Sequence, residues 1–243
     1  MLIKKLVIGV RPAQKMFRVS SLGGVLVDNV LSLRGTKYID NEYFLNVAQD
    51  LEKATIQLSN EEAGNLLQIT HSDIIFTKDW YGQDNTTKNI ESALDEYHTI
   101  WKKVNEVLLV KGIRRIGIVG EQQVECNDKV PSSALLGALT KSSASNHPTK
   151  FILRYEDRKN LSHKGVPDFR SDSFINVIRE YYDSSQDAQH KSDNHFNANI
   201  DVQRFYSPLL EGGVYDEVAK LYKQFKEERK LFENDLKVRG LLV

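Results

Sequence analysis

The chain has 243 residues, of which 40% are hydrophobic and 27% charged, so it can bury an ordinary core without disulfides or a structural metal. Lysine plus arginine and aspartate plus glutamate number 33 each, which excludes the strong global charge typical of proteins dedicated to polyanions. The single cysteine, Cys126, excludes an internal disulfide framework, and no apolar run is long enough to span a bilayer. We expect a cytoplasmic protein that needs no cofactor and does not bind membranes.

The beginning of the chain is expected to be rich in β-structure. A dense apolar run over residues 2–10 is too short for a signal peptide and predicts a strand. Residues 16–19 and 23–33 are also β-prone, and the run Ser21–Gly24 favours a turn where they meet. The span 42–53 fits a helix or a strand.

Three short segments follow at close spacing, over residues 54–59, 65–70 and 74–80. Apolar and polar residues alternate in the first and last of them, and turn-forming residues separate all three. Period-2 alternation is typical of strands that bury one face of a sheet. This part of the sequence therefore predicts a three-stranded antiparallel meander.

The clearest helix covers about residues 87–109. Its apolar side chains recur at steps of three and four residues, which places them on one stripe of a helix: Ile90, Leu94, Tyr97, His98, Trp101, Val104 and Leu108. We expect this helix to pack on the meander and to bury Leu94 and Trp101.

A second round of strands and a helix follows. An apolar strand containing Gly117 and Gly120 is predicted over 113–120; it lacks the residues of a phosphate-binding loop, so its glycines fit close packing against a helix. The Ser-, Asn- and Pro-rich stretch 126–149 is interpreted as a linker or long loop. Beyond it we expect strands at 151–155 and 198–206, a helix or strand at 173–182 and a polar loop at 183–197.

The chain is predicted to end in an amphipathic helix of about 25 residues. Its apolar side comprises Val214, Val218, Leu221, Tyr222, Phe225, Phe232 and Leu236. The order of elements predicts an α+β fold with two related halves, each an antiparallel sheet with one long amphipathic helix. The halves are expected at 1–125 and 150–243.

Two stretches resemble a sporadically distributed, uncharacterised prokaryotic family that is often encoded near mobile-element or defence genes. The first runs from Ala54 to Trp80 and continues through the helix with Tyr97 and Trp101. The second runs from Asn199 to Tyr206, followed by a helix that contains Lys230–Leu236. The resemblance implies a fold of two related α+β halves and a defence or mobile-element context, and implies no settled activity.

A possible catalytic pair is Arg158 and His163. A histidine can move a 2′-hydroxyl proton and an arginine can hold phosphate charge, as in a ribonuclease. However, the residues around this pair predict a solvated basic loop rather than a helical bundle. We therefore predict no catalytic site and retain Arg158 and His163 only as an alternative.

A possible metal site lies in the polar loop that contains Asp187, His190, Asp193 and His195. Imidazole and carboxylate groups can bind a divalent metal. None of these residues shows helical spacing within a periodic segment, and a flexible loop is poorly preorganised for a metal. We predict a surface loop without metal, with His190, Asp193 and His195 as the alternative ligands.

Two surfaces are candidates for binding a partner. Arg114, Lys150, Arg154 and Arg158 could form a basic patch that binds a nucleic-acid backbone if their strands lie side by side. The apolar side of the last helix, including Phe225 and Phe232, is long for the sheet it must cover and could pack on another protein chain or a second copy.

The sequence favours an interaction or regulatory protein over an enzyme. We expect its partner to be a protein chain bound through the last helix, and its context to be an antiviral defence or mobile-element system. The alternative is a nucleic-acid-directed enzyme that uses Arg158 and His163 or a metal.

Overall fold

The structure is a computed structural model that describes residues 2–50, 52–80, 87–126, 130–140, 142, 150–183 and 195–242. Its strands are β1 (Leu2–Pro12), β2 (Asn46–Asp50), β3 (Thr55–Asn60), β4 (Asn65–Ile69), β5 (Ile74–Asp79), β6 (Ile113–Glu125), β7 (Phe151–Asn160), β8 (Phe174–Asp183) and β9 (His195–Leu210). Its helices are α1 (Arg18–Ser21), α2 (Gly23–Leu31), α3 (Thr87–Leu108), α4 (Pro131–Thr140) and α5 (Val214–Val238).

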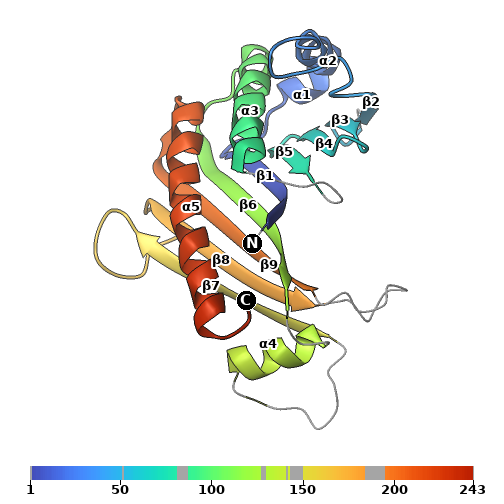
Figure 1. The fold of residues 1–243 in the computed structure, drawn as a ribbon. Coiled ribbons are helices and arrows are strands. Elements are labelled where there is room, and N and C mark those ends of the chain that lie inside the picture. The colour runs from blue at the N-terminus through green and yellow to red at the C-terminus, as the bar shows by residue number, and fades with distance from the viewer. Residues whose placement is uncertain are drawn as a thin grey trace.

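The strands form one nine-stranded antiparallel sheet in the order β2-β3-β4-β5-β1-β6-β9-β8-β7 (Figure 1). Strands β1 and β6 pair along its middle, so that Leu6 lies opposite Gly120 and Val10 opposite Ile116. The mixed α+β class is confirmed. We had expected a separate sheet in each half of the chain; the pairing of β1 with β6 instead joins all the strands into one sheet.

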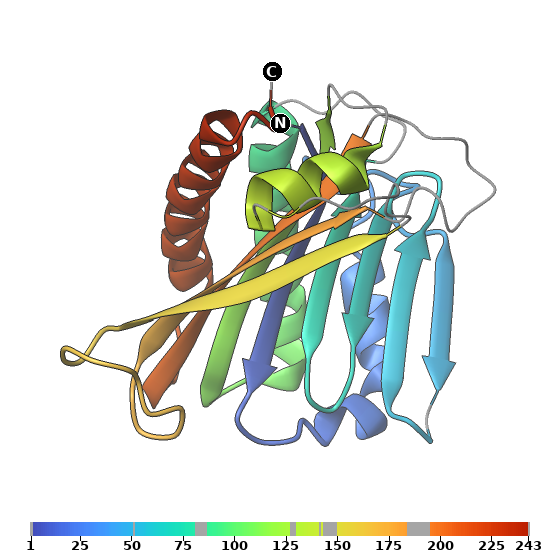
Figure 2. The same ribbon diagram turned by 90° about the horizontal axis from the view of Figure 1, so that it is seen from below.

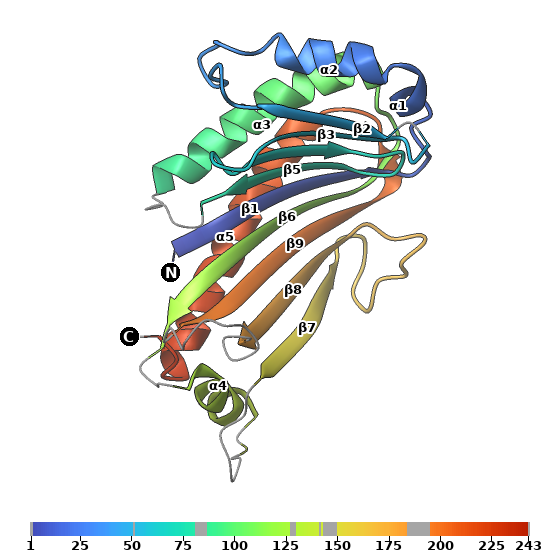
Figure 3. The same cartoon turned by 90° about the vertical axis from the view of Figure 1, so that its right-hand side faces the viewer.

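Helices α2, α3 and α5 lie on the same face of this sheet (Figures 2 and 3). The sequence explains this through strict alternation: Leu6, Ile8 and Val10 of β1 are at most 1% exposed beneath the helices. The intervening residues of β1 point to the opposite face, which no helix covers in the described part of the chain. The hydrophobic core therefore lies between the sheet and a single layer of helices.

The meander predicted over 54–80 is present as β3, β4 and β5, and α3 follows it as expected. Trp101 is 7% exposed and belongs to the core, whereas Leu94 is only partly buried at its margin. The span that fitted either a helix or a strand contains the edge strand β2.

Helix α5 crosses β6 and β9, and the apolar residues predicted on its core side are all buried. Phe225 lies directly over Gly120: a Cβ atom added at Gly120 would come within 2.5 Å of the Phe225 Cζ atom. Gly120 thus allows an aromatic ring to sit against the backbone of a central strand. Packing of a glycine against a helix, expected for this strand, is found at Gly120.

Residues 16–19 and 23–33, expected as β-prone, instead contain helices α1 and α2. In α2 the four-residue step between Leu26 and Val30 places both side chains on one face of the helix, and Val19 is the buried residue of α1. All three are at most 1% exposed, and α2 packs against α3. Burial against a neighbouring helix outweighs their β-propensity.

The stretch 126–149, interpreted as a linker or long loop, contains helix α4 over Pro131–Thr140. Leu135 of α4 is fully buried, and the Ser132 hydroxyl donates a hydrogen bond to the Asp183 carboxylate at 2.5 Å. The apolar residues in this stretch therefore anchor a helix at the ends of β7 and β8.

A buried polar group connects α3 to the sheet. Glu96 of α3 accepts a hydrogen bond from the Tyr43 hydroxyl at 2.6 Å and forms an ion pair with Lys78 of β5 at 3.1 Å. Lys78 also donates to Asn65 of β4 at 2.6 Å. Burial, together with the Glu96 charge, raises the pKa of Tyr43. Each charged side chain in the group has an opposite charge or a hydrogen-bond partner, as a buried charge requires.

None of the described helices is both long and apolar enough to cross a membrane.

Candidate functional site

The face of the sheet that the helices leave uncovered is polar and presents side chains from every strand. We call it the open face. Its centre is built by β1, β6 and β9, whose residues point away from the helices in strict alternation. In these three strands the open-face residues are Lys5, Val7, Gly9, Arg11, Arg115, Gly117, Val119, Glu121, Gln123, Asn197, Asn199, Asp201, Gln203 and Phe205.

A hollow of about 200 Å³ lies in the middle of this face, and we call it the central hollow. Gly9 of β1 and Gly117 of β6 lie directly opposite each other and form its floor. Neither glycine has a positive φ angle. A Cβ atom at Gly9 would meet nothing within 4 Å, and one at Gly117 would meet Gln203 Cγ at an ordinary 3.5 Å. The backbone and the packing therefore do not require glycine at either position.

Two arginines border the central hollow on adjacent strands, because the register places Arg11 opposite Arg115. Arg11 forms a two-pronged ion pair with Asp73, with Nε and Nη2 donating to the two carboxylate oxygens at 2.6 and 2.8 Å. Arg115 has no hydrogen bond or ion pair within the described residues; its guanidinium lies 5.8 Å from the centre of the Phe205 ring. Burial and the neighbouring Arg11 charge lower the pKa of Arg115.

Asp201 of β9 lines the same hollow. One of its oxygens, Oδ2, accepts a hydrogen bond from Gln203 Nε2 at 2.5 Å. The other, Oδ1, is buried and has no hydrogen-bond partner within the described residues. Burial raises the pKa of Asp201 to about 6, against the lowering effects of Gln203, Arg115 and Arg154. The central hollow thus contains an incompletely paired carboxylate and an incompletely paired guanidinium that do not pair with each other.

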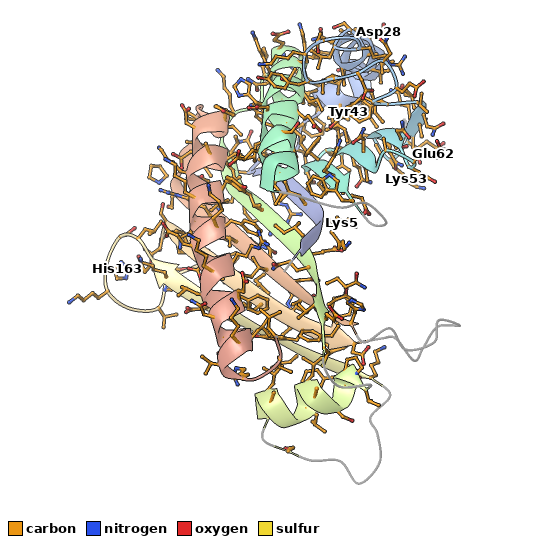
Figure 4. The ribbon with its side chains drawn as sticks, in the orientation of Figure 1. Lys5, Asp28, Tyr43, Lys53, Glu62 and His163 are labelled. Atoms are coloured by element: carbon orange, nitrogen blue, oxygen red, sulfur yellow. The ribbon has the colours of Figure 1, made fainter. Side chains whose placement is uncertain are left out.

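A second hollow of about 380 Å³ lies on the open face over β3, β4, β5 and β1. Its lining is mainly acidic and polar: Glu61, Glu62 and Asp79 provide carboxylates, and Lys5 provides the basic group. Figure 4 labels Lys5 on β1 and Glu62 in the turn between β3 and β4. Lys5 also lies 3.7 Å from Glu121 of β6. The charge on this part of the face is therefore mostly negative.

The alternative catalytic pair is not assembled as a site. Arg158 lies in the edge strand β7 and forms an ion pair with Glu156 at 2.9 Å. His163 lies in the exposed loop between β7 and β8, far from Lys5 in Figure 4, and is 3.8 Å from Asp172. Neither residue lines a hollow described above.

The predicted basic patch is divided. Strand β6, which holds Arg114, is separated from the edge strand β7 by β9 and β8, so the two are not neighbours. The Arg114 guanidinium donates to the backbone carbonyls of Tyr206 and Phe169, which fixes it to the protein itself. Arg154 points to the open face with Arg158, where Glu156 lies between them, and Lys150 is an exposed residue just before β7.

Phe225 and Phe232, predicted as contacts for a partner, are 0% and 1% exposed. Their rings pack under α5 on the chain's own sheet, Phe225 on Gly120 and Phe232 against Tyr181. The apolar side of α5 packs on β6 and β9, and Tyr181 of β8 contacts Phe232, so these two rings leave no surface for a partner.

Of the alternative metal ligands, His190 and Asp193 lie outside the described residues. His195 is the first residue of β9, and its Nδ1 atom is buried without a partner in the described part of the chain. Among the described residues, no three His, Cys, Asp or Glu side chains form a group that could hold a metal ion.

Sequence reasoning missed Gly9, Arg115 and Asp201 as members of one site. Each lies in a segment recognised as a strand, and the signal available was a glycine at an outward position in each of two strongly apolar strands. Glycine inside a strand often marks a close approach of another molecule or backbone. The register between the strands, which brings the residues together, is not readable from local sequence.

Comparisons with known proteins leave the chain without a family. No family model matches its sequence, and no curated protein matches it. A similar solved structure is described as "Structure of Rolling Circle Replication Initiator Protein from Geobacillus stearothermophilus". It has 9% identity to this chain and a TM-score of 0.32, and the match covers 91% of this chain and 78% of that one. A likeness of this size carries no inference about function.

Proposed function

We propose that the chain is a non-enzymatic interaction protein that binds another polypeptide through the open face of its sheet. The observation that carries the proposal is the composition of this face, which the described helices leave uncovered. Half-buried Val7, Ile75 and Val119 lie at its centre, surrounded by amide and charged side chains. Apolar groups at the centre with a polar rim are the usual anatomy of a protein-binding surface.

The charge of the open face favours a protein partner over nucleic acid. Its basic side chains are Lys5, Arg11, Arg115, Arg154 and Arg158. Its acidic side chains, which outnumber them, are Asp73, Asp79, Glu121, Glu156, Glu180 and Asp201, together with Glu61 and Glu62 of the second hollow. Arg11 and Arg158 are already paired with carboxylates. Phosphate backbones are bound by surfaces with an excess of free lysine and arginine, which this face lacks.

The same excess of acidic groups favours a different polypeptide over a second copy of the chain. A symmetric dimer through the open face would bring one acidic surface against an identical one. A partner with a moderate excess of basic groups and many hydrogen-bonding side chains would be complementary instead. We therefore assign the surface to a heterologous protein with those properties.

Two further elements of the proposal concern organisation and context. We infer that the segments 1–125 and 150–243 are related halves, since each contains an antiparallel meander followed by a long helix. The meander β3-β4-β5 precedes α3, and the meander β7-β8-β9 precedes α5. The family resemblance supports a role as an accessory or sensor component of a cytoplasmic defence or mobile-element system.

Site-specific photo-crosslinking in the cells that produce the protein tests the surface. A benzophenone amino acid would replace Gln68 or Gln123 on the open face, or Leu231, which is 60% exposed on α5. The expected result is one polypeptide crosslinked from both open-face positions and not from Leu231. The proposal is wrong if crosslinks arise only from Leu231, only to a second copy, only to nucleic acid, or from no position.

A charge reversal then tests the captured polypeptide in purified form. Glu180→Lys places a positive charge on the open face, whereas Glu227→Lys makes the same change on the exposed side of α5. We expect the first variant to weaken binding about tenfold, because it repels a basic partner, and the second to leave binding unchanged. Equal effects of the two variants would exclude the open face as the binding surface.

A further inference from the structure

We propose that the central hollow is a subsite for a primary carboxamide, such as the side chain of a glutamine or asparagine. The inference deepens the proposed function and rests on it for the source of that group, which would be the partner polypeptide.

The floor of the hollow is open because Gly9 and Gly117 are both glycine. Glycine inside a strand costs stability relative to residues with a side chain, roughly 0.5–1 kcal/mol against alanine. Neither residue needs glycine for its φ angle, and a Cβ atom at either position would meet no close contact. What the two glycines provide together is access to the middle of the sheet, which a side chain at either position would block.

The charges in the hollow select a neutral group with both a donor and an acceptor. A cation would be attracted by Asp201 and repelled by the unpaired Arg115 guanidinium, and an anion would meet the reverse. The remaining charged groups there, Arg11 and Asp73, neutralise each other in their two-pronged pair. A primary carboxamide offers a carbonyl oxygen to Arg115 and an amino group to the Asp201 carboxylate, so it compensates both groups at once.

The size of the hollow fits one side-chain end group. Its volume of about 200 Å³ is below the roughly 300–1,000 Å³ typical of pockets for drug-sized ligands. The aliphatic carbons of Val7, Ile75 and Val119 line the hollow and can contact the methylene groups of a glutamine or asparagine. An end group buried at the centre of an interface is also where contacts contribute most to binding.

Small probes test the subsite without a partner. Propionamide, propionate and propylammonium have nearly the same size and are neutral, anionic and cationic. They would be titrated into isotope-labelled protein while NMR follows the amides of Gly9 and Gly117 and the side-chain Nε–H of Arg115. We expect propionamide to shift these signals with a dissociation constant in the millimolar range, and each charged probe to bind at least several-fold more weakly.

Two substitutions with matched controls complete the test. Arg115→Met removes the donor and Gly117→Val fills the floor, and each is expected to abolish the propionamide shifts. Two controls lie outside the central hollow: Arg154→Met makes the same arginine change on the open face, and Gly212→Val makes the same glycine change beyond the end of β9. Both controls are expected to leave the propionamide shifts intact. Circular dichroism confirms that each variant is folded, and Arg115→Leu, which also lacks a donor, replaces Arg115→Met if the latter is not.

The outcomes separate this inference from the proposed function. Equal binding of the three probes, or preference for a charged probe, overturns the carboxamide subsite. Propionamide binding at Arg115 and Gly117 supports the subsite, even if no partner crosslinks to the open face and the proposed function fails. Partner crosslinking from Gln68 and Gln123 with no propionamide binding leaves the proposed function standing and overturns the subsite.

Discussion

The same substitution at two glycines of β6 is expected to have opposite effects on stability. Gly117 points to the open face and Gly120 to the helices, three residues further along the strand. A methyl group at Gly117 would make an ordinary contact of 3.5 Å with Gln203 Cγ. One at Gly120 would lie 2.5 Å from Phe225 Cζ, a ring that is fully buried between α5 and the sheet.

The magnitude follows from two terms. Replacing glycine by alanine where the conformation allows it stabilises a protein by roughly 0.4–1 kcal/mol, because the unfolded chain loses freedom. Overpacking a core costs typically about 1–3 kcal/mol. The first term is common to both variants and cancels between them, so Gly120→Ala should be less stable than Gly117→Ala by about 1–3 kcal/mol. Gly117→Ala should be slightly more stable than the wild type.

Urea unfolding of the three proteins, followed by circular dichroism, measures the difference in the free energy of unfolding. In thermal unfolding it corresponds to a separation of roughly 2–12 °C at this chain length. A second variant identifies the cause: Phe225→Leu removes the Cζ atom, so its cost should be smaller in the Gly120→Ala background than in the wild type. Equal stability of the two alanine variants, or additive costs in the double variant, would refute the proposed packing of α5.

Four further outcomes follow from the structure. Burial raises the folded-state pKa of Asp201 from 3.8 to about 6, so the free energy of unfolding should fall by up to about 3 kcal/mol as the pH rises through that interval. Urea unfolding at pH 4 and pH 8 measures this fall, and the Asp201→Asn variant should lack it. Glu96→Ala leaves Lys78 buried without its ion pair and should lower the free energy of unfolding by about 3–5 kcal/mol. A smaller loss in the double variant Glu96→Leu, Lys78→Met would attribute the cost to the unpaired charge. Duplex DNA should bind with a dissociation constant no tighter than about 10⁻⁴ M near physiological salt in fluorescence anisotropy, and micromolar binding would contradict the charge argument for the open face. His163→Ala should behave as the wild type in a purified RNA-cleavage assay, whereas a loss of about 10²–10⁴-fold with the fold retained would restore the nuclease hypothesis.

Local periodicity was sufficient where burial is one-sided and the pattern is long. The core-facing residues of α5 were all identified, from Val214 to Leu236, because a helix of this length repeats its apolar stripe many times. The meander of β3, β4 and β5 was identified for the same reason with a period of two. The pattern failed at α2, where a short run of apolar β-branched residues fits both structures until its neighbour α3 is known.

The sequence by itself determined the fold class, the two long helices and the buried side of β3 and β5, since these depend on residues close together in the chain. The tertiary structure alone decided that Gly9, Gly117 and Asp201 share one hollow, because the registers of β1 with β6 and of β6 with β9 join segments far apart in sequence. It also decided that Phe225 and Phe232 belong to the core: an apolar helical stripe looks the same whether it covers its own sheet or a partner, and only the packed sheet supplies the surface that buries it.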